Sequence, residues 1–220
     1  MDIPLSHVKP VYTSSSHQEE DLSIQSLLSH LDLHPHPEGG YFAETHRNPL
    51  QIPNPFQQGS QGDSQDDETR SASTAIYYLL TPRFPVGVFH RNQAQTIHTL
   101  HRGRGRYVVI HSNPNSQDRT AKADIETFVV GPNLERGERM QWVVPGGMYK
   151  ASFLLPDSPA SDDRLTNIDG SSEDSTGLLI SEVQIVVPGF EYTDNDFLHK
   201  DQMDDLLSPE QIRELAWLVK

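Results

Sequence analysis

The sequence predicts an all-β sandwich or barrel with short helices at both ends. About eight short runs of apolar or alternating residues follow one another, and clusters of Gly and Pro separate them. Short strands with regular turns between them are typical of these folds. Helical spacing of apolar residues is confined to the two ends of the chain. The length of 220 residues suits a single domain of this class.

The N-terminal part predicts an arm, a helix and a first strand. Residues 1–17 are polar and interrupted by Pro, so we expect a loose arm. Over 18–33 the apolar positions are spaced for one helix face, and the helix should end before Pro35. The next segment is rich in Pro and Gly, which favour a turn, and we interpret His34 and His36 as turn or solvent residues. It leads into a strand over 41–47.

The centre of the chain predicts the main β region. Two alternating runs between Val86 and His111 flank Gly103-Arg104-Gly105, a pattern that predicts a β-hairpin. Two segments rich in Ser, Asp, Gln and Gly, 51–70 and 156–176, have little to bury and are predicted to be flexible insertions. The other predicted strands are 73–80, 125–130, 140–144, 149–155 and 178–187.

The last segment, 199–220, predicts a helical tail. Ser208 is followed by Pro209 and then by Gln211, which together form a capping box with Pro at the first helical position. Apolar residues then recur at helical spacing.

Composition limits the function classes. The formal net charge of −14 argues against nucleic-acid binding, and the acidic excess lies in 51–70, 156–176 and 191–214. There is no cysteine, which excludes disulfides and thiolate chemistry and fits a reducing compartment. No apolar run approaches the roughly 18 residues of a membrane span. We therefore expect a cytoplasmic protein without a membrane partner.

One stretch differs from this acidic background. Between Ser71 and Gln117 there is no Asp or Glu, whereas five Arg and four His fall there. A carboxylate-free segment rich in Arg and His predicts a site for an anionic or electron-rich molecule. The alternative is a solvated rim of arginines with some histidines in the core.

Five separated phrases along the chain form a recognisable set. They are His36-Pro-Glu-Gly-Gly-Tyr-Phe-Ala-Glu-Thr-His-Arg47, Ser73-Thr-Ala-Ile-Tyr-Tyr-Leu-Leu80, Phe89-His-Arg91, Val144-Pro-Gly-Gly147 and Val187-Pro-Gly-Phe190. In their order and spacing, these phrases resemble the DUF985 family of cupins. The resemblance implies a double-stranded β-helix, or jelly roll, with a ligand pocket inside the barrel, and usually a homodimer. On this basis, residues 18–198 form one cupin domain.

The chain departs from the metal-binding pattern of cupins. Thr96 stands where that pattern has a ligand Glu, and Lys150 stands where the second motif has a ligand His. A hydroxyl group is a poor replacement for a carboxylate, and an ammonium group repels a divalent cation. We therefore expect no metal ion and no other cofactor.

The candidate catalytic residues are His98 and Lys150. His98 should face the barrel interior, either as a packing replacement for an aromatic residue of the family or as a general acid or base. Lys150 is either a rim residue or an interior cation suited to proton transfer or Schiff-base formation. If both face one molecule, they form the reactive pair.

Six further residues are candidates for ligand binding. Arg91 is a possible anion partner, Tyr78 either donates a hydroxyl or packs, and Trp142 is either core or a platform. For Glu44, a buried structural ion pair with Arg47 is favoured over ligand binding. The full set is His90, Arg91, Tyr78, Thr96, Trp142 and Glu44.

Three functions follow. The first is a metal-independent isomerase, epimerase or lyase that acts on a small polar or anionic metabolite. The second is a non-catalytic small-molecule binding protein. The third is a metal-dependent oxygenase, which the missing ligands disfavour.

Overall fold

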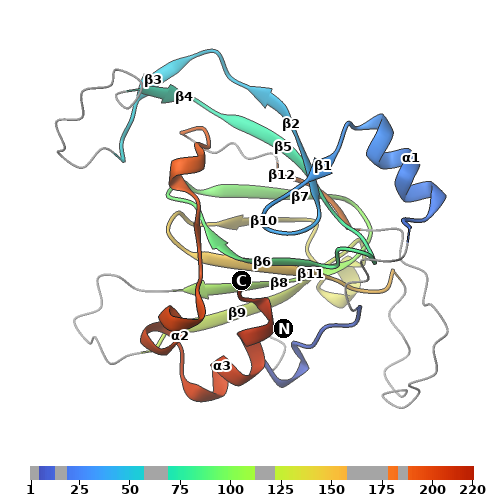
Figure 1. Ribbon diagram of the computed structural model, residues 1–220, viewed down its shortest axis with the longest axis vertical. Coiled ribbons are helices and arrows are strands. Elements are labelled where there is room, and N and C mark those ends of the chain that lie inside the picture. The colour runs from blue at the N-terminus through green and yellow to red at the C-terminus, as the bar shows by residue number, and fades with distance from the viewer. Residues whose placement is uncertain (1–4, 13–18, 57–68, 112–121, 158–177, 183–187) are drawn as a thin grey trace.

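The computed structural model describes residues 5–12, 19–56, 69–111, 122–157, 178–182 and 188–220. Two β-sheets face one another, and helices cover their outer faces (Figure 1). This arrangement confirms the predicted all-β jelly roll. Among the described residues, no helix has both the length and the apolar character that a membrane span requires.

The six-stranded sheet has the order β1-β2-β5-β12-β7-β10. All its pairings are antiparallel. The expected strands over 41–47 and 73–80 are present as β2 and β5. Its members are β1 (His34–Pro35), β2 (Tyr41–Arg47), β5 (Thr74–Leu80), β7 (Thr96–Arg102), β10 (Gln141–Val144) and β12 (Leu178–Glu182). The predicted strand over 178–187 is thus found for its first five residues, and 183–187 lie outside the described residues.

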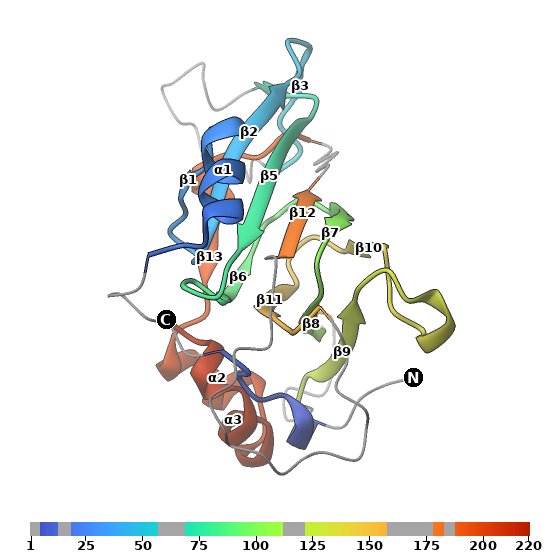
Figure 2. The ribbon, with the colours of Figure 1, turned by 90° about the vertical axis from the view of Figure 1, so that its right-hand side faces the viewer.

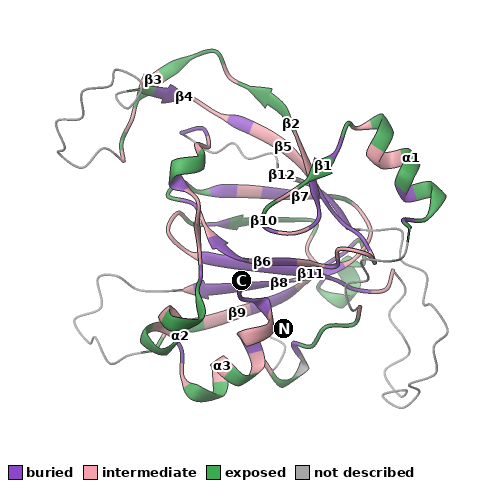
Figure 3. Cartoon of the chain, in the orientation of Figure 1, coloured by how far each residue is buried: buried purple, intermediate pink, exposed green. Residues whose placement is uncertain are grey.

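The five-stranded sheet has the order β13-β6-β11-β8-β9 and is also antiparallel. Its strands are largely buried (Figure 3). Its members are β6 (Val86–Arg91), β8 (Gly105–His111), β9 (Asp124–Val130), β11 (Tyr149–Leu154) and β13 (Asp196–Phe197).

The predicted hairpin over 86–111 is wrong. β7 and β8 are consecutive in the chain but belong to different sheets, so the Gly103–Gly105 turn is a corner between the sheets (Figure 2). Gly103 has a φ of 81°, which favours glycine at this corner. A hairpin and a sheet-crossing corner share the same local signals, because both need alternating runs and a glycine turn.

The ends of the chain pack more closely than their composition predicts. Val8 is fully buried in one cluster with the helices α2 (Lys200–Leu206) and α3 (Pro209–Leu215) against the five-stranded sheet. The described part of the arm, 5–12, is therefore not loose. The capping box at Ser208 is confirmed. On the opposite side, α1 (Leu22–His30) packs on the six-stranded sheet through Ile24.

The first predicted insertion begins and ends with ordered strands. β3 (Gln51–Pro53) pairs with β4 (Thr69–Ser71), and Arg70 is buried. The expectation of a flexible segment over 51–70 therefore fails at both ends, and 57–68 lie outside the described residues. Of the second insertion, 158–176 lie outside them as well.

Candidate functional site

A pocket of about 40 Å³ lies where β2, β5, β6 and the segment 188–195 meet. Its wall contains both polar and apolar or aromatic side chains. The wall consists of His36, Glu38, Phe42, Glu44, Ile76, His90, Asn92, Phe190 and Tyr192.

Glu38 is the buried carboxylate of this wall, and the loop that carries it needs its two glycines. Gly39 has a φ of 104°, and a Cβ atom there would overlap the carbonyl oxygen of Val86. This close approach lets the Glu38 carbonyl accept a hydrogen bond from the Val88 amide at 2.8 Å. The Pro-Glu-Gly-Gly sequence therefore fixes the Glu38 carboxylate beside β6.

The Glu38 carboxylate contacts His90 and Asn195. Its Oε2 lies 3.1 Å from His90 Nε2, and its Oε1 accepts a hydrogen bond from Asn195 Nδ2 at 3.0 Å. Both side chains of the Glu38–His90 pair are 9% exposed. His36 lies on the other side, where its Nδ1 accepts the Glu38 backbone N–H at 3.4 Å.

The His90 ring lies between two acceptors. Its Nδ1 is 2.9 Å from the Val88 carbonyl oxygen, which can only accept, so Nδ1 carries a proton. Its Nε2 faces the Glu38 carboxylate. For this contact to be a hydrogen bond, one more proton must lie between the two groups, on Nε2 or on Glu38. In that arrangement the pair has an exchangeable proton at the pocket wall.

A second polar group lies deeper, between the sheets. Lys150 on β11 is 2% exposed, and its Nζ donates to the Thr96 hydroxyl on β7 at 3.2 Å. That hydroxyl is also 3.0 Å from His98 Nε2. His98 is fully buried and stacks on Trp142, with ring centroids 5.1 Å apart and planes 4° apart.

The two polar groups are adjacent. Lys150 pairs in register with His90 across β11 and β6. In the amide orientation that its neighbours favour, the Asn92 oxygen accepts from Lys150 Nζ at 3.3 Å. Asn92 lines the pocket, so the ammonium group lies one layer behind the wall.

The structure therefore brings together Thr96, His98, Lys150 and Trp142, but it encloses them. Neither His98 nor Lys150 is part of the pocket wall. Tyr78 is 4% exposed and its ring contacts His36 with centroids 5.9 Å apart. Of the eight predicted site residues, His90 and Glu44 line the pocket.

One predicted role fails on geometry, and a second is found without the expected burial. Arg91 follows His90 on the strand and so points to the opposite face, where it pairs with Asp196 at 2.7 Å and covers the Tyr149 ring. It cannot hold an anion in this pocket. Glu44 is ion-paired with Arg47 at 2.9 Å, but both side chains are 38% exposed, so the pair is not buried.

Sequence reasoning missed Glu38, His36, Asn92 and the two aromatic residues of segment 188–195. Glu38 could have been found, because it stands in the quoted Pro-Glu-Gly-Gly phrase between residues that demand a tight backbone. His36 was interpreted as a turn or solvent residue, yet its side chain is only 8% exposed.

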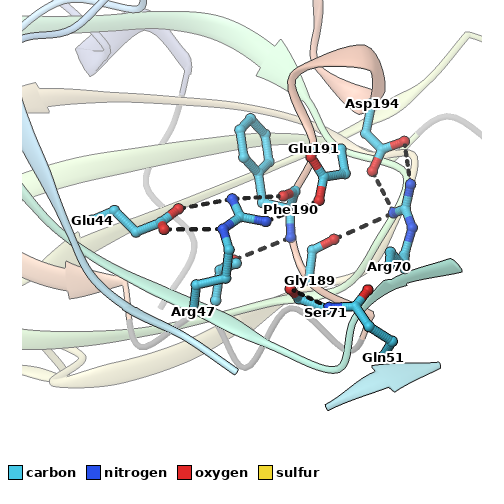
Figure 4. A network of polar contacts seen from close by, with 10 residues as sticks. Glu44, Arg47, Gln51, Arg70, Ser71, Gly189, Phe190, Glu191 and Asp194 are labelled. Carbon is cyan, nitrogen blue, oxygen red and sulfur yellow. Dashed lines mark hydrogen bonds and ion pairs between the residues drawn. The ribbon is translucent and has the colours of Figure 1, made fainter. Parts of the chain in front are cut away.

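A strap formed by residues 188–195 contributes Phe190 and Tyr192 to the pocket wall. Figure 4 shows the polar contacts that hold this strap. Arg70 holds it through a bidentate pair with Asp194, at 2.6 and 3.2 Å, and both side chains are at most 5% exposed. The Gly189 amide donates to the Ser71 carbonyl at 2.7 Å. Arg47 adds a contact to Glu191 at 2.9 Å. The strap is thus tied to β2 and β4.

The residues at the expected metal centre do not fit a metal ion. Thr96 and Lys150 meet there, and the ammonium group of Lys150 supplies a positive charge instead of a lone pair. Among the described residues, no group of three or more His, Cys, Asp or Glu side chains is arranged to hold a metal.

The fold and the enclosed interior site define a cupin. The model of the Cupin superfamily (DUF985) matches residues 25–198, and the chain belongs to this family. It is 42% identical over 203 residues to the uncharacterized protein YML079W of Saccharomyces cerevisiae, covering 91% of this chain and 88% of that protein.

Two solved structures are similar along almost their whole length. A hypothetical protein from Leishmania major has a TM-score of 0.62 and 28% identity, covering 89% of this chain and 97% of that one. Protein SO0799 from Shewanella oneidensis has a TM-score of 0.58 and 19% identity, covering 90% and 98%. The second likeness concerns the fold alone.

Proposed function

We propose that this cupin is a metal-independent enzyme of the isomerase, epimerase or lyase type, with Glu38 and His90 as its acid–base pair. The carrying observation is the 3.1 Å contact between His90 Nε2 and Glu38 Oε2 on the pocket wall, through which the two groups can share a proton. General acid–base catalysis needs such a group within reach of a bound molecule.

In the proposed reaction, the pair gives its proton to a bound molecule and takes one back when the product forms. After donation, Glu38 is left as a carboxylate, which the amide of Asn195 stabilises at 3.0 Å. The enclosed ammonium of Lys150, next to His90 in register, offsets negative charge that develops in the pocket. His98 supports Thr96 from behind and does not touch the molecule.

Solvent exchange tests this proposal. Small metabolites are screened by thermal shift, and each hit is incubated with the protein in D₂O and followed by NMR for deuterium incorporation. We expect exchange, and we expect His90→Gln and Glu38→Gln to slow it by about 10²-fold. Binding without exchange would contradict the proposal and favour a non-catalytic binding protein.

The chain offers a matched control. His111 and Glu126 form a second imidazole–carboxylate pair, also with 3.1 Å between Nε2 and Oε2, but on the surface. His111→Gln should leave the exchange rate unchanged. An equal loss in this variant would show that the effect of His90→Gln is not specific to the pocket.

A further inference from the structure

Among the described residues, those that line the pocket include acidic side chains and no Lys or Arg. Its charged members are the carboxylates of Glu38 and Glu44, together with the titratable rings of His36 and His90. When His90 carries a positive charge, the Glu38 carboxylate at 3.1 Å compensates it. The wall itself therefore offers no uncompensated cation to an anionic ligand.

The cations around the pocket are already engaged. Arg47 contacts both Glu44 and Glu191, each at 2.9 Å. Arg70 forms a bidentate ion pair with Asp194. Lys150 is 2% exposed and donates to the Thr96 hydroxyl, so its charge acts only through the wall.

The wall also contains aromatic and aliphatic side chains, which lie among the polar ones. Phe190 and Tyr192 contact each other edge to face, with centroids 5.3 Å apart, Phe42 contacts the His36 ring, and Ile76 pairs in register with Glu44. Tyr192 is 64% exposed, so its ring is available at the mouth of the pocket. Aromatic faces bind the apolar faces of rings and attract cations.

The strap that carries Phe190 and Tyr192 is held in place before any ligand arrives. The Phe190 amide donates to the Thr74 hydroxyl at 3.1 Å, and the ion pairs of the strap fix the residues around it (Figure 4). A ligand that binds against Phe190 therefore does not have to order the segment, which favours affinity.

From these walls we infer that the pocket takes an uncharged or cationic ring compound with a hydroxyl or amino group, and that it discriminates against anions. The donor group enters the pocket and meets the carboxylates. The ring is too large for a space of about 40 Å³ and lies at its mouth, against Tyr192 and the neighbouring Phe190. This inference rests on the proposed function only in using the same pocket. It replaces the expectation of an anionic metabolite, since the arginines that suggested it do not line the pocket.

Three probes of nearly equal shape test the inference: benzylamine, benzyl alcohol and benzoate. Binding is measured by saturation-transfer NMR and titration at pH 7. We expect the dissociation constant of benzoate to be at least tenfold higher than those of the amine and the alcohol. Tyr192→Ala and Phe190→Ala should each weaken the binding of all three probes.

The charge of the wall is tested separately. Glu44→Gln leaves Arg47 bound to Glu191. It should weaken the binding of benzylamine several-fold, change the binding of benzyl alcohol little and strengthen the binding of benzoate. Glu126→Gln, on β9 away from the pocket, is the control and should change none of them.

Two outcomes would overturn the inference: benzoate binding as tightly as the amine, or no binding of any probe at millimolar concentration. These equilibrium measurements are independent of turnover. If the probes bind in the expected order but no metabolite exchanges deuterium, the ligand class stands and the catalytic proposal fails.

Discussion

Lys150 and His98 are joined through the hydroxyl of Thr96, which lies 3.2 Å from the ammonium nitrogen of one and 3.0 Å from the imidazole Nε2 of the other. Because the ammonium group only donates, Thr96 accepts from it and can give its own proton to His98. The three groups satisfy one another in a place that water does not reach.

Thr96→Val tests this arrangement. Valine keeps the shape of the side chain but removes the hydroxyl, so Lys150 and His98 each lose a buried partner. We expect the free energy of unfolding to fall by about 1–3 kcal/mol. Urea denaturation measures it, with Thr99→Val on the opposite face of β7 as the matched control. Equal, small effects in both variants would show that the bridge contributes little.

Lys150→Met separates function from stability. Among the described residues, no carboxylate lies within ion-pairing distance of this buried ammonium, and burying a charge without an ion pair is costly. We therefore expect the free energy of unfolding to stay the same or to rise by about 1 kcal/mol. Deuterium exchange into a bound metabolite should fall by about 10²-fold, because the positive charge that offsets negative charge developing in the pocket is lost.

The opposite pattern would contradict this assignment. If Lys150→Met unfolds at lower urea concentration but keeps full exchange, Lys150 is a structural residue. Circular dichroism in urea measures the unfolding of each variant, and NMR of the same samples measures its deuterium exchange.

The fold could be predicted because its signals are local. Alternating strands such as 41–47 and the capping box at Ser208 depend on side chains that are neighbours in the chain. The corner at Gly103 could not be distinguished from a hairpin, because the difference lies in which sheet each strand joins. That choice depends on distant partners, such as the pairing of β8 with β11 and of β7 with β12.

The candidate site was predictable only in part, for a similar reason. The enclosed group around Thr96 follows from strand alternation, which places alternate residues on the same face. The pocket wall instead combines the loop at Glu38 with a strap about 150 residues later in the sequence. No local pattern in the sequence indicates that Asn195 donates to Glu38.

The buried pair between Arg70 and Asp194 should be the strongest anchor of the strap. Arg70→Met leaves the Asp194 carboxylate buried without its partner, and we expect a loss of about 3–5 kcal/mol in the free energy of unfolding. Arg47→Met removes the half-exposed pairs of the same strap and should cost less than about 1 kcal/mol. Similar losses in both variants would mean that burial does not distinguish the two anchors.

A homodimer remains a prediction, which the resemblance to cupins motivates. The edge strand β10 exposes Val143 by 51%, and the preceding Met140 is 43% exposed. Light scattering should give twice the chain mass of 24.8 kDa at micromolar concentration. If this edge forms the dimer contact, Val143→Lys should lower the measured mass towards that of a single chain. A wild-type mass of one chain would refute the dimer.

Tyr41 should make the stability fall in alkaline solution. Burial, and next the charge of Glu20 and the hydrogen bond to it at 3.0 Å, raise the pKa of Tyr41 to about 12. An unfolded chain loses this proton near pH 10. The stabilisation is therefore complete below pH 10 and is lost as the pH rises towards 12, because the unfolded state releases its proton first.

Urea denaturation at pH 9, 10 and 11 measures this effect. Tyr41→Phe removes the titrating group, so its free energy of unfolding should decrease less steeply between pH 10 and 11 than that of the wild type. Tyr149→Phe should act in the same direction, since burial above all, opposed by Arg91 and aided by Asp196, raises the pKa of Tyr149 to about 12. A slope unchanged by Tyr41→Phe would show that the phenol of Tyr41 titrates alike in the folded and unfolded chains.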